Sequence, residues 1–239
     1  MMCKEVYKDS TNFSILGIDC HNLLQLESEI KDRCLSTQDR DKFINLINSI
    51  DDTGFKPTSI NNLPIKEWQV GECLAEVYLS HCYSCSFPWS SNKDLKNQKS
   101  SLPGADLVGF YKNGFAFGEV KTSSEKKYPP QVTSAKDGLN NQLNNLCSDQ
   151  NLRMTLIQYL FHRLGEEPEF KQALTCYLKD NQFNIFGVLV RDTKPNIDDW
   201  KYLKKNLSPH LQSNVFLIAL YLPHSIKKLH QIISIEEGL

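Results

Sequence analysis

The sequence contains no apolar run close to the length of a membrane-spanning helix, which needs about 18 or more consecutive apolar residues. Its opening segment, residues 1–5, includes charged side chains, and no apolar segment follows it. We therefore expect no secretory signal peptide. Internal repeats and low-complexity segments are also missing. These absences predict a cytoplasmic protein without a membrane partner.

The sequence also has almost no net charge, because 27 basic residues stand against 28 acidic ones. A protein that binds nucleic acid through its overall charge carries a clear positive excess. A nucleic-acid enzyme with this balance needs local basic patches, a metal ion at its site, or a partner that delivers the nucleic acid. The charge restricts this class of function without excluding it.

Paired cysteine motifs are scarce, although the chain has eight cysteines. Cys82 and Cys85 form one Cys-x-x-Cys motif with Cys73 nearby, whereas a structural zinc site usually has a second matching pair. A redox motif would open a helix after a strand, and this one follows a helix. We expect free thiols, and a zinc or redox protein is the least favoured function.

The remaining composition is that of a soluble globular protein, with 239 residues, 40% of them hydrophobic and 23% charged. Continuous apolar runs over residues 183–190 and 215–222 are typical of central strands buried on both faces. The helical pattern over residues 195–207 makes this part a βαβ unit. Apolar periodicity predicts further helices over residues 65–83, 132–147, 152–164 and 168–178. The expected fold class is α/β with a mixed central sheet flanked by helices.

Residues 1–60 differ from the rest, because a short strand over residues 13–18 is followed by helical patterns over residues 23–34 and 38–50. No residue there carries identifiable chemistry. We expect an α-rich N-terminal layer that packs on the core, docks a partner or regulates. Residues 61–239 are expected to form the main domain.

A β-hairpin is predicted over residues 104–122. Asn113-Gly114 lies between two alternating apolar runs, and this dipeptide is the strongest short-range signal for a two-residue turn. With Asn113 and Gly114 as the loop, Lys112 pairs with Phe115, and further out Asp106 pairs with Lys121.

This pairing brings two carboxylates and a lysine together. Cross-strand neighbours share a face of the sheet, and so do alternate residues of one strand. Asp106, Glu119 and Lys121 are therefore expected on one face. The Glu-x-Lys pattern alone has little value, because the chain contains it four times. Only Glu119 and Lys121 lie in a predicted buried strand with an aspartate across the hairpin. A cross-strand ion-pair cluster is the alternative reading of the same residues.

Such a cluster is suited to metal-dependent hydrolysis of phosphodiesters. Mg²⁺ favours oxygen ligands and keeps several waters, so Asp106 and Glu119 together with phosphate oxygens would suffice. A metal-bound water would attack the phosphorus. Lys121 would orient that water or neutralise the charge that develops on the phosphoryl oxygens. The expected cofactor is Mg²⁺, with Mn²⁺ able to substitute.

Several lysines lie close to this hairpin in the sequence. Three precede it in a long polar stretch, and two follow it: Lys93, Lys96, Lys99, Lys126 and Lys127. Long loops in compact domains are usually functional or disordered. These lysines either contact DNA phosphates or belong to solvated loops.

The arrangement resembles the PD-(D/E)xK nuclease superfamily, with its restriction-endonuclease-like fold. Gly104-Ala-Asp106 stands where the first motif of that superfamily stands, and Glu119-Val-Lys121 where the second stands; Ala105 departs from the usual proline. Several members have an upstream helix that Gly71–Leu79 resembles. By this resemblance Glu72 completes the metal site, with Glu76 the weaker candidate. Gln142, a candidate DNA contact, lies on a helix that touches the site in related folds.

More narrowly, the Gly-Ala-Asp and Gly-Glu-Val-Lys-Thr segments, the upstream helix and the chain length resemble the HamA/AbpA type of nuclease from Hachiman-like bacterial antiphage defence. Membership would imply a superfamily-2 helicase partner, HamB- or AbpB-like, that restrains the nuclease until it senses foreign or damaged DNA. The predicted function is a Mg²⁺-dependent DNA nuclease. The alternative is a catalytically silent α/β adaptor whose acids hold a partner or a sheet end.

Overall fold

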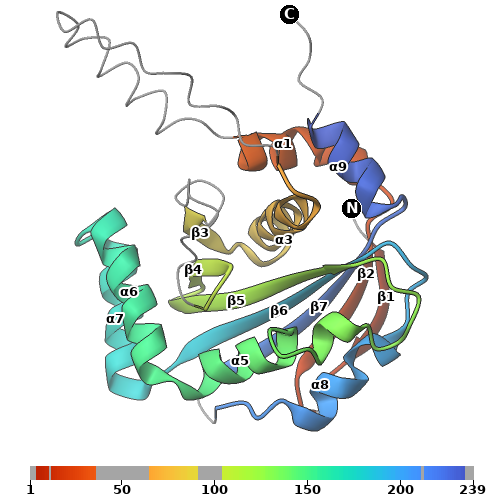
Figure 1. The fold of residues 1–239 in the computed structure, drawn as a ribbon. Coiled ribbons are helices and arrows are strands. Elements are labelled where there is room, and N and C mark those ends of the chain that lie inside the picture. Colours follow the sequence, from red (N-terminus) through yellow and green to blue (C-terminus); the bar gives the residue numbers. More distant parts are fainter. Residues whose placement is uncertain (1–3, 11, 36–64, 91–103, 211–212, 235–239) are drawn as a thin grey trace, which may run out of the picture.

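The computed structural model describes residues 4–10, 12–35, 65–90, 104–210 and 213–234. At its centre lies a seven-stranded sheet with the order β1-β2-β7-β6-β5-β4-β3 (Figure 1). The strands are β1 (Lys4–Asp9), β2 (Ser14–Asp19), β3 (Ser86–Ser90), β4 (Leu107–Tyr111), β5 (Gly114–Ser123), β6 (Phe183–Arg191) and β7 (Ser213–Tyr221). The prediction of an α/β fold with a mixed central sheet is confirmed.

Four neighbouring strands, β5, β6, β7 and β2, run parallel, and antiparallel strands extend the sheet on both sides. Parallel neighbours need crossover connections, which helices supply. Between β6 and β7 the crossover contains the 3₁₀ helix η3 (Ile197–Trp200) and α8 (Lys201–Asn206). The predicted βαβ unit is therefore confirmed.

Helices cover both faces of the sheet (Figure 1). One face carries α1 (Glu27–Leu35), α3 (Glu67–Tyr83) and α9 (Ile226–Ser234). The other carries α5 (Leu139–Ser148), α6 (Gln150–Leu164), α7 (Pro168–Asp180) and α8. Strand β5 contributes to two separate cores, because Phe115 and Phe117 pack on the α5 side and Ala116 and Val120 on the α3 side. This alternation is the period-two pattern of a strand buried on both faces.

The N-terminal region shares the main sheet in its described part. Strand β2 pairs with β7, and α1 packs against α3. Both the short strand and the first helical pattern predicted there are found, with the 3₁₀ helix η1 (Leu23–Gln25) preceding α1. The helix predicted over residues 38–50 lies outside the described residues. How residues 1–60 divide from residues 61–239 in function stays a prediction.

One helix boundary differs clearly from the sequence prediction. A single helix was expected over residues 132–147, whereas the chain forms the 3₁₀ helix η2 (Gln131–Thr133) and starts α5 only at Leu139. Gly138 is extended, with ψ of 167°, and precedes the first helical turn. Its N–H donates to the carbonyl of Ala135 (2.8 Å), which closes a turn before α5. Helix-breaking glycine thus separates the two segments.

In the part of the chain that the structure describes, every helix is too short or too polar to cross a membrane.

Candidate active site

The β4–β5 hairpin has a different register from the one the sequence predicts. Tyr111 pairs with Gly114, so Lys112 and Asn113 form the loop, and Lys112 has a positive φ of 54°. The predicted pairing of Lys112 with Phe115 is therefore wrong. Phe115 instead lies opposite Phe110 in the core, with ring centroids 5.8 Å apart. Aromatic cross-strand pairs of this kind stabilise one register over another.

The register error amounts to two residues, which leaves every side chain on its expected face. Side chains alternate with a period of two, so only an odd shift would move them to the other face. Leu107 pairs with Gly118. The next residues outward, Asp106 and Glu119, are therefore adjacent across the hairpin. Asp106 lies opposite Glu119 instead of the predicted Lys121.

Asp106 lies where β4 begins and takes over part of the strand's hydrogen bonding. Its backbone N–H donates to the carbonyl of Gly118 (2.9 Å). Its carboxylate Oδ2 accepts from the backbone N–H of Val120 (2.9 Å). The Asp106 side chain thus accepts from the N–H of a β5 residue that lies beyond the end of the β4 ladder. These two bonds fix the Asp106 carboxylate against β5.

Glu119 and Lys121 complete a contiguous group with Asp106. The Lys121 ammonium donates to Glu119 Oε1 (2.5 Å), and Glu119 is only 2% exposed. The carboxyl groups of Asp106 and Glu119 lie close enough together for each to shift the pKa of the other. Two neighbouring carboxyl groups can share one proton, because two like charges at this distance repel. The structure therefore brings together the three residues that the sequence singled out.

Glu72 reaches this group from α3. Its carboxyl interacts with that of Asp106 and lowers the Asp106 pKa, and its charge contributes to the raised pKa of Lys121. The preceding Gly71 permits the approach, since a Cβ there would lie 2.1 Å from Thr122 Oγ1 on β5. Glycine is needed where backbone and neighbour come this close. The glycine of the Gly71-Glu72 pattern is thus required by the packing of α3 on β5.

Glu76 is buried one helical turn further on but has a different neighbour. Its Oε2 lies 3.5 Å from Arg33 Nη1 of α1, and the residue is 1% exposed. The two glutamates, at positions i and i+4 of α3, therefore have different partners. Glu72 belongs to the carboxylate group, and Glu76 pairs with Arg33 of α1.

The electrostatics of the group follow from its burial. Burial is the main cause that raises the pKa of Glu119 to about 8, and the neighbouring Asp106 adds to it. Burial also raises the pKa of Asp106, against the effect of Lys121. Burial would lower the pKa of Lys121, but Glu119 and Asp106 outweigh it and raise the pKa. Several acids thus share one cation in a low-dielectric site.

The donor set fits a hard divalent cation. Carboxylate oxygens are the ligands that Mg²⁺ prefers. Burial is the main cause of the raised pKa values of Asp106 and Glu119, and the charge of Lys121 does not offset it. As the side chains lie, the described His, Cys, Asp and Glu residues include no group of three that could hold a metal ion. A metal would thus compete with the ion pair between Lys121 and Glu119.

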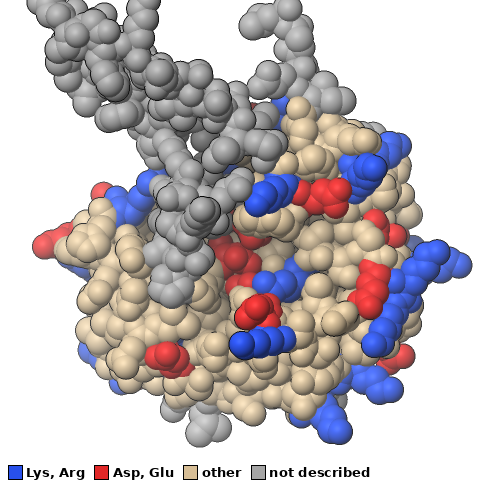
Figure 2. All heavy atoms as spheres, in the orientation of Figure 1, with Lys and Arg blue, Asp and Glu red and all other residues tan. Residues whose placement is uncertain are grey.

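The other residues expected at the site are scattered. Lys126 and Lys127 are exposed in the segment that follows β5. Gln142, on α5, donates to the carbonyl of Asp137 (3.1 Å) and stays a predicted DNA contact. Lys93, Lys96 and Lys99 lie outside the described residues. On the part of the face that Figure 2 colours, acidic and basic side chains are interspersed, and both kinds meet near its centre.

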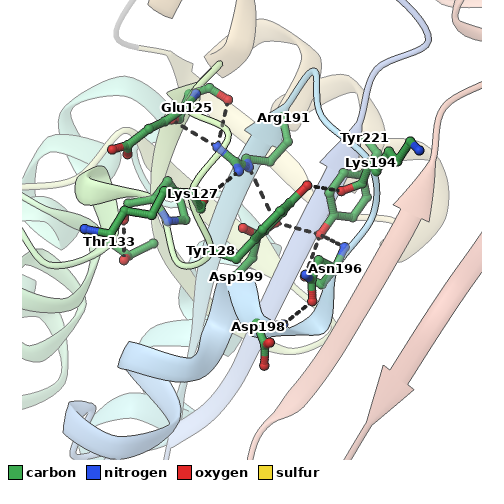
Figure 3. A network of polar contacts seen from close by, with 12 residues as sticks. Glu125, Lys127, Tyr128, Thr133, Arg191, Lys194, Asn196, Asp198, Asp199 and Tyr221 are labelled. Carbon is green, nitrogen blue, oxygen red and sulfur yellow. Dashed lines mark hydrogen bonds and ion pairs between the residues drawn. The ribbon is translucent and has the colours of Figure 1, made fainter.

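A buried polar network beyond the end of β5 was not predicted from the sequence. The Arg191 guanidinium, fully buried at the end of β6, donates to the carbonyls of Ser123 and Lys127 (3.1 Å each) and lies 3.4 Å from Asp199 (Figure 3). Asp199 in turn accepts from the hydroxyl of Tyr221 (2.7 Å). The available signal was the polar run Arg191–Lys194 directly after a predicted buried strand, since loops at the carboxyl ends of parallel strands commonly carry function.

A comparison with models of known protein families gives a match over most of the chain. The family model HamA matches residues 8–233. The chain belongs to the HamA family. This HamA-family protein is therefore an antiphage defence-associated protein. None of the curated proteins compared with the chain matches it.

Proposed function

We propose that this HamA-family protein is a Mg²⁺-dependent nuclease of the PD-(D/E)xK type that hydrolyses phosphodiester bonds in DNA. The observation that carries the proposal is the contact of Asp106 and Glu119 across the hairpin, with Lys121 bonded to Glu119 at 2.5 Å. Glu72 adds a third acid from α3. Ionisable groups whose pKa values are shifted by burial together with a specific charge partner are candidates for a functional site.

Asp106, Glu119 and Glu72 are the residues that would hold the metal. A bound Mg²⁺ supplies Lewis-acid polarisation of the phosphate and activation of a water molecule. Mn²⁺ would substitute, because it accepts the same oxygen ligands.

Lys121 would act on the phosphate rather than on the metal. Its ammonium group is held beside Glu119 and is kept charged by the surrounding acids. With the carboxylates holding a metal, Glu119 would bind this ammonium less strongly, and the ammonium could then contact the substrate. There it would neutralise charge that develops on the phosphoryl oxygens, a contribution of about 3–4 kcal/mol for one donor in comparable enzyme sites.

Control by a superfamily-2 helicase partner, HamB- or AbpB-like, is part of the proposal. It is supported by membership of the HamA family and by the net charge of −1. Without a positive excess, the protein gains little DNA affinity from its overall charge. A helicase that holds the DNA would supply that affinity.

The test is degradation of plasmid and linear DNA with Mg²⁺, with and without the helicase partner. The wild type is compared with a Glu119→Gln/Lys121→Ala variant. A matched control, Glu169→Gln/Lys171→Ala, removes the same Glu-x-Lys pattern from the exposed surface of α7. We expect cleavage by the wild type and the control and none by the site variant.

The alternative adaptor makes the opposite prediction. An adaptor would not cleave DNA in any combination, and Mn²⁺ would not raise its melting temperature. Cleavage that survives in the Glu119→Gln/Lys121→Ala variant would contradict the site while leaving a nuclease elsewhere in the chain.

A further inference from the structure

A cavity of about 430 Å³ lies beyond the carboxyl ends of β5 and β6. It is lined by residues of the two segments that follow these strands: Ser124, Lys126, Tyr128, Asp192, Thr193 and Lys194. In open α/β sheets, ligands bind in the crevice outside the carboxyl ends of parallel strands. Since β5 carries Glu119 and Lys121, the cavity follows the candidate active site along the same strand.

We propose that this cavity binds a phosphate group of the nucleic-acid strand that enters the active site. The proposal rests on the nuclease function proposed above and adds a binding site to it. Two lysines line the cavity against one aspartate. Neither the Lys126 nor the Lys194 ammonium has an ionic partner among the described residues. Both cations are thus available to an anion.

The one acid in the lining is already engaged. Asp192 Oδ2 accepts from the hydroxyl of Ser124 (2.8 Å) and from the backbone N–H of Ile226 (3.0 Å). Ile226 is the first residue of α9, where the helix dipole favours negative charge. The carboxylate is thereby compensated inside the protein and opposes a bound phosphate less than a free acid would.

Thr193 gives an independent indication of a ligand. Its hydroxyl oxygen is shielded from solvent and has no hydrogen-bond partner among the described residues. Buried polar atoms are nearly always satisfied, and an exception suggests a missing ion or ligand. A hydroxyl can donate to a phosphate oxygen. A phosphate in the cavity would supply the partner that Thr193 lacks once the side chain turned its hydroxyl, which is shielded from solvent as it lies, towards the cavity.

Arg191 connects the two segments that form the cavity, the one that follows β5 and the one that follows β6. Its guanidinium donates to Ser123 Oγ and to the carbonyls of Ser123 and Lys127 (3.1 Å each), and it lies 5.5 Å from the ring centroid of Tyr128 (Figure 3). The hydroxyl of Tyr128 donates across to the carbonyl of Lys194 (2.9 Å). Arg191 is a positioning residue, because it is fully buried and fixes both lysine-bearing segments.

The phosphate has two sources, the 5′ end of a strand or an internal phosphodiester. Binding of fluorescent single-stranded DNA, with and without a 5′-phosphate, is measured by anisotropy in EDTA over a range of salt concentrations. The variants are Lys126→Ala/Lys194→Ala and Thr193→Val, and the control is Lys205→Ala on the exposed surface of α8. Circular dichroism and melting temperature show that each variant is folded.

We expect the double variant to bind at least fivefold more weakly than the control, with the slope of log K against log salt reduced by about 0.7 for each lost contact. Thr193→Val should weaken binding in the same direction. A terminal source predicts that the wild type prefers the 5′-phosphorylated strand and that the variant loses this preference. An internal source predicts that both strands weaken equally.

Unchanged affinity and slope in the double variant would overturn the proposal while leaving the nuclease function intact. A wild-type protein that binds neither strand would remove the cavity proposal, and cleavage of DNA by the same preparation with Mg²⁺ would then show whether the nuclease function stands.

Discussion

Gly71 of α3 and Thr122 of β5 are in closer contact than any side chain at position 71 would allow, because a Cβ there would lie 2.1 Å from Thr122 Oγ1. This contact determines how near the helix that carries Glu72 comes to the strand that carries Glu119. The position of α3 therefore decides whether Glu72 lies close to the carboxyl groups of Asp106 and Glu119.

Gly71→Ala is expected to destabilise the fold by about 1–3 kcal/mol, as overpacking of a core does, and to lower nuclease activity by displacing Glu72. The clash involves one atom, so Thr122→Ala should rescue the variant, since the Thr122 Cβ would be 3.4 Å from the new methyl. Thr122→Val keeps a group in the position of Oγ1 and should not rescue it. Urea unfolding and DNA degradation measure both effects. Equal rescue by alanine and valine would contradict the contact as the cause.

The two glutamates of α3 should respond differently to the same substitution. Glu72→Gln is expected to lower cleavage by about 100-fold or more, the loss typical of a group that stabilises the transition state, while the protein stays folded. Glu76→Gln removes the partner of Arg33 and should mainly lower the melting temperature. Activity and thermal unfolding are measured on both variants. A larger loss of cleavage in Glu76→Gln would assign the helix acid to position 76.

The raised pKa of Glu119 predicts that the metal-free protein loses stability as pH rises. The folded pKa is about 8 against 4.5 for the free side chain, so between these values the folded state holds a proton that the unfolded state has released. The free energy of unfolding therefore falls as pH rises from about 5 to 8. Urea unfolding in EDTA measures it at several pH values.

Glu119→Gln serves as the control for this pH dependence, because it has no proton to release and should flatten that part of the profile. A saturating concentration of Mg²⁺ should also reduce the slope in the wild type, since a cation favours the ionised carboxylates. A wild-type profile that rises over this interval would contradict the buried, protonated state.

Lys112 occupies a backbone conformation that favours glycine, with φ of 54°. Lys112→Gly should stabilise the protein by up to about 1–2 kcal/mol, the cost of a left-handed conformation for a residue with a Cβ. Asn113→Gly, at the other loop position, should give no such gain, because Asn113 is not among the described residues with positive φ. Chemical denaturation of both variants measures the difference. A larger gain at position 113 would favour the register that the sequence predicts.

The hairpin shows how far the sequence could predict the site. The apolar alternation fixed the faces of Asp106, Glu119 and Lys121 correctly, because a shift of two residues conserves the face. It could not fix the register, because the choice between two loops depends on how Phe110 and Phe115 pack in the core. Local turn preference is weak against such tertiary contacts.

The long apolar strands and the βαβ unit were predicted because burial on both faces leaves a continuous pattern in the sequence. Strand β1 was not predicted, since the edge of a sheet has no such pattern and its residues are mostly exposed. The Arg191 network was also not predicted. Its members come from β5, β6, η3 and β7, and no local pattern records that these segments meet.

The pairing of β2 with β7 joins residues 14–19 to residues 216–221. During synthesis from the N-terminus, the β1–β2 pair can therefore join the sheet only after β7 has been made. Contacts between such distant segments form late, because a long loop must close first. The α3 layer packs on the same late-completed sheet. A chain released before β7 would lack the strand that lies between β2 and β6, so the sheet on which α3 and the carboxylate group rest would stay incomplete.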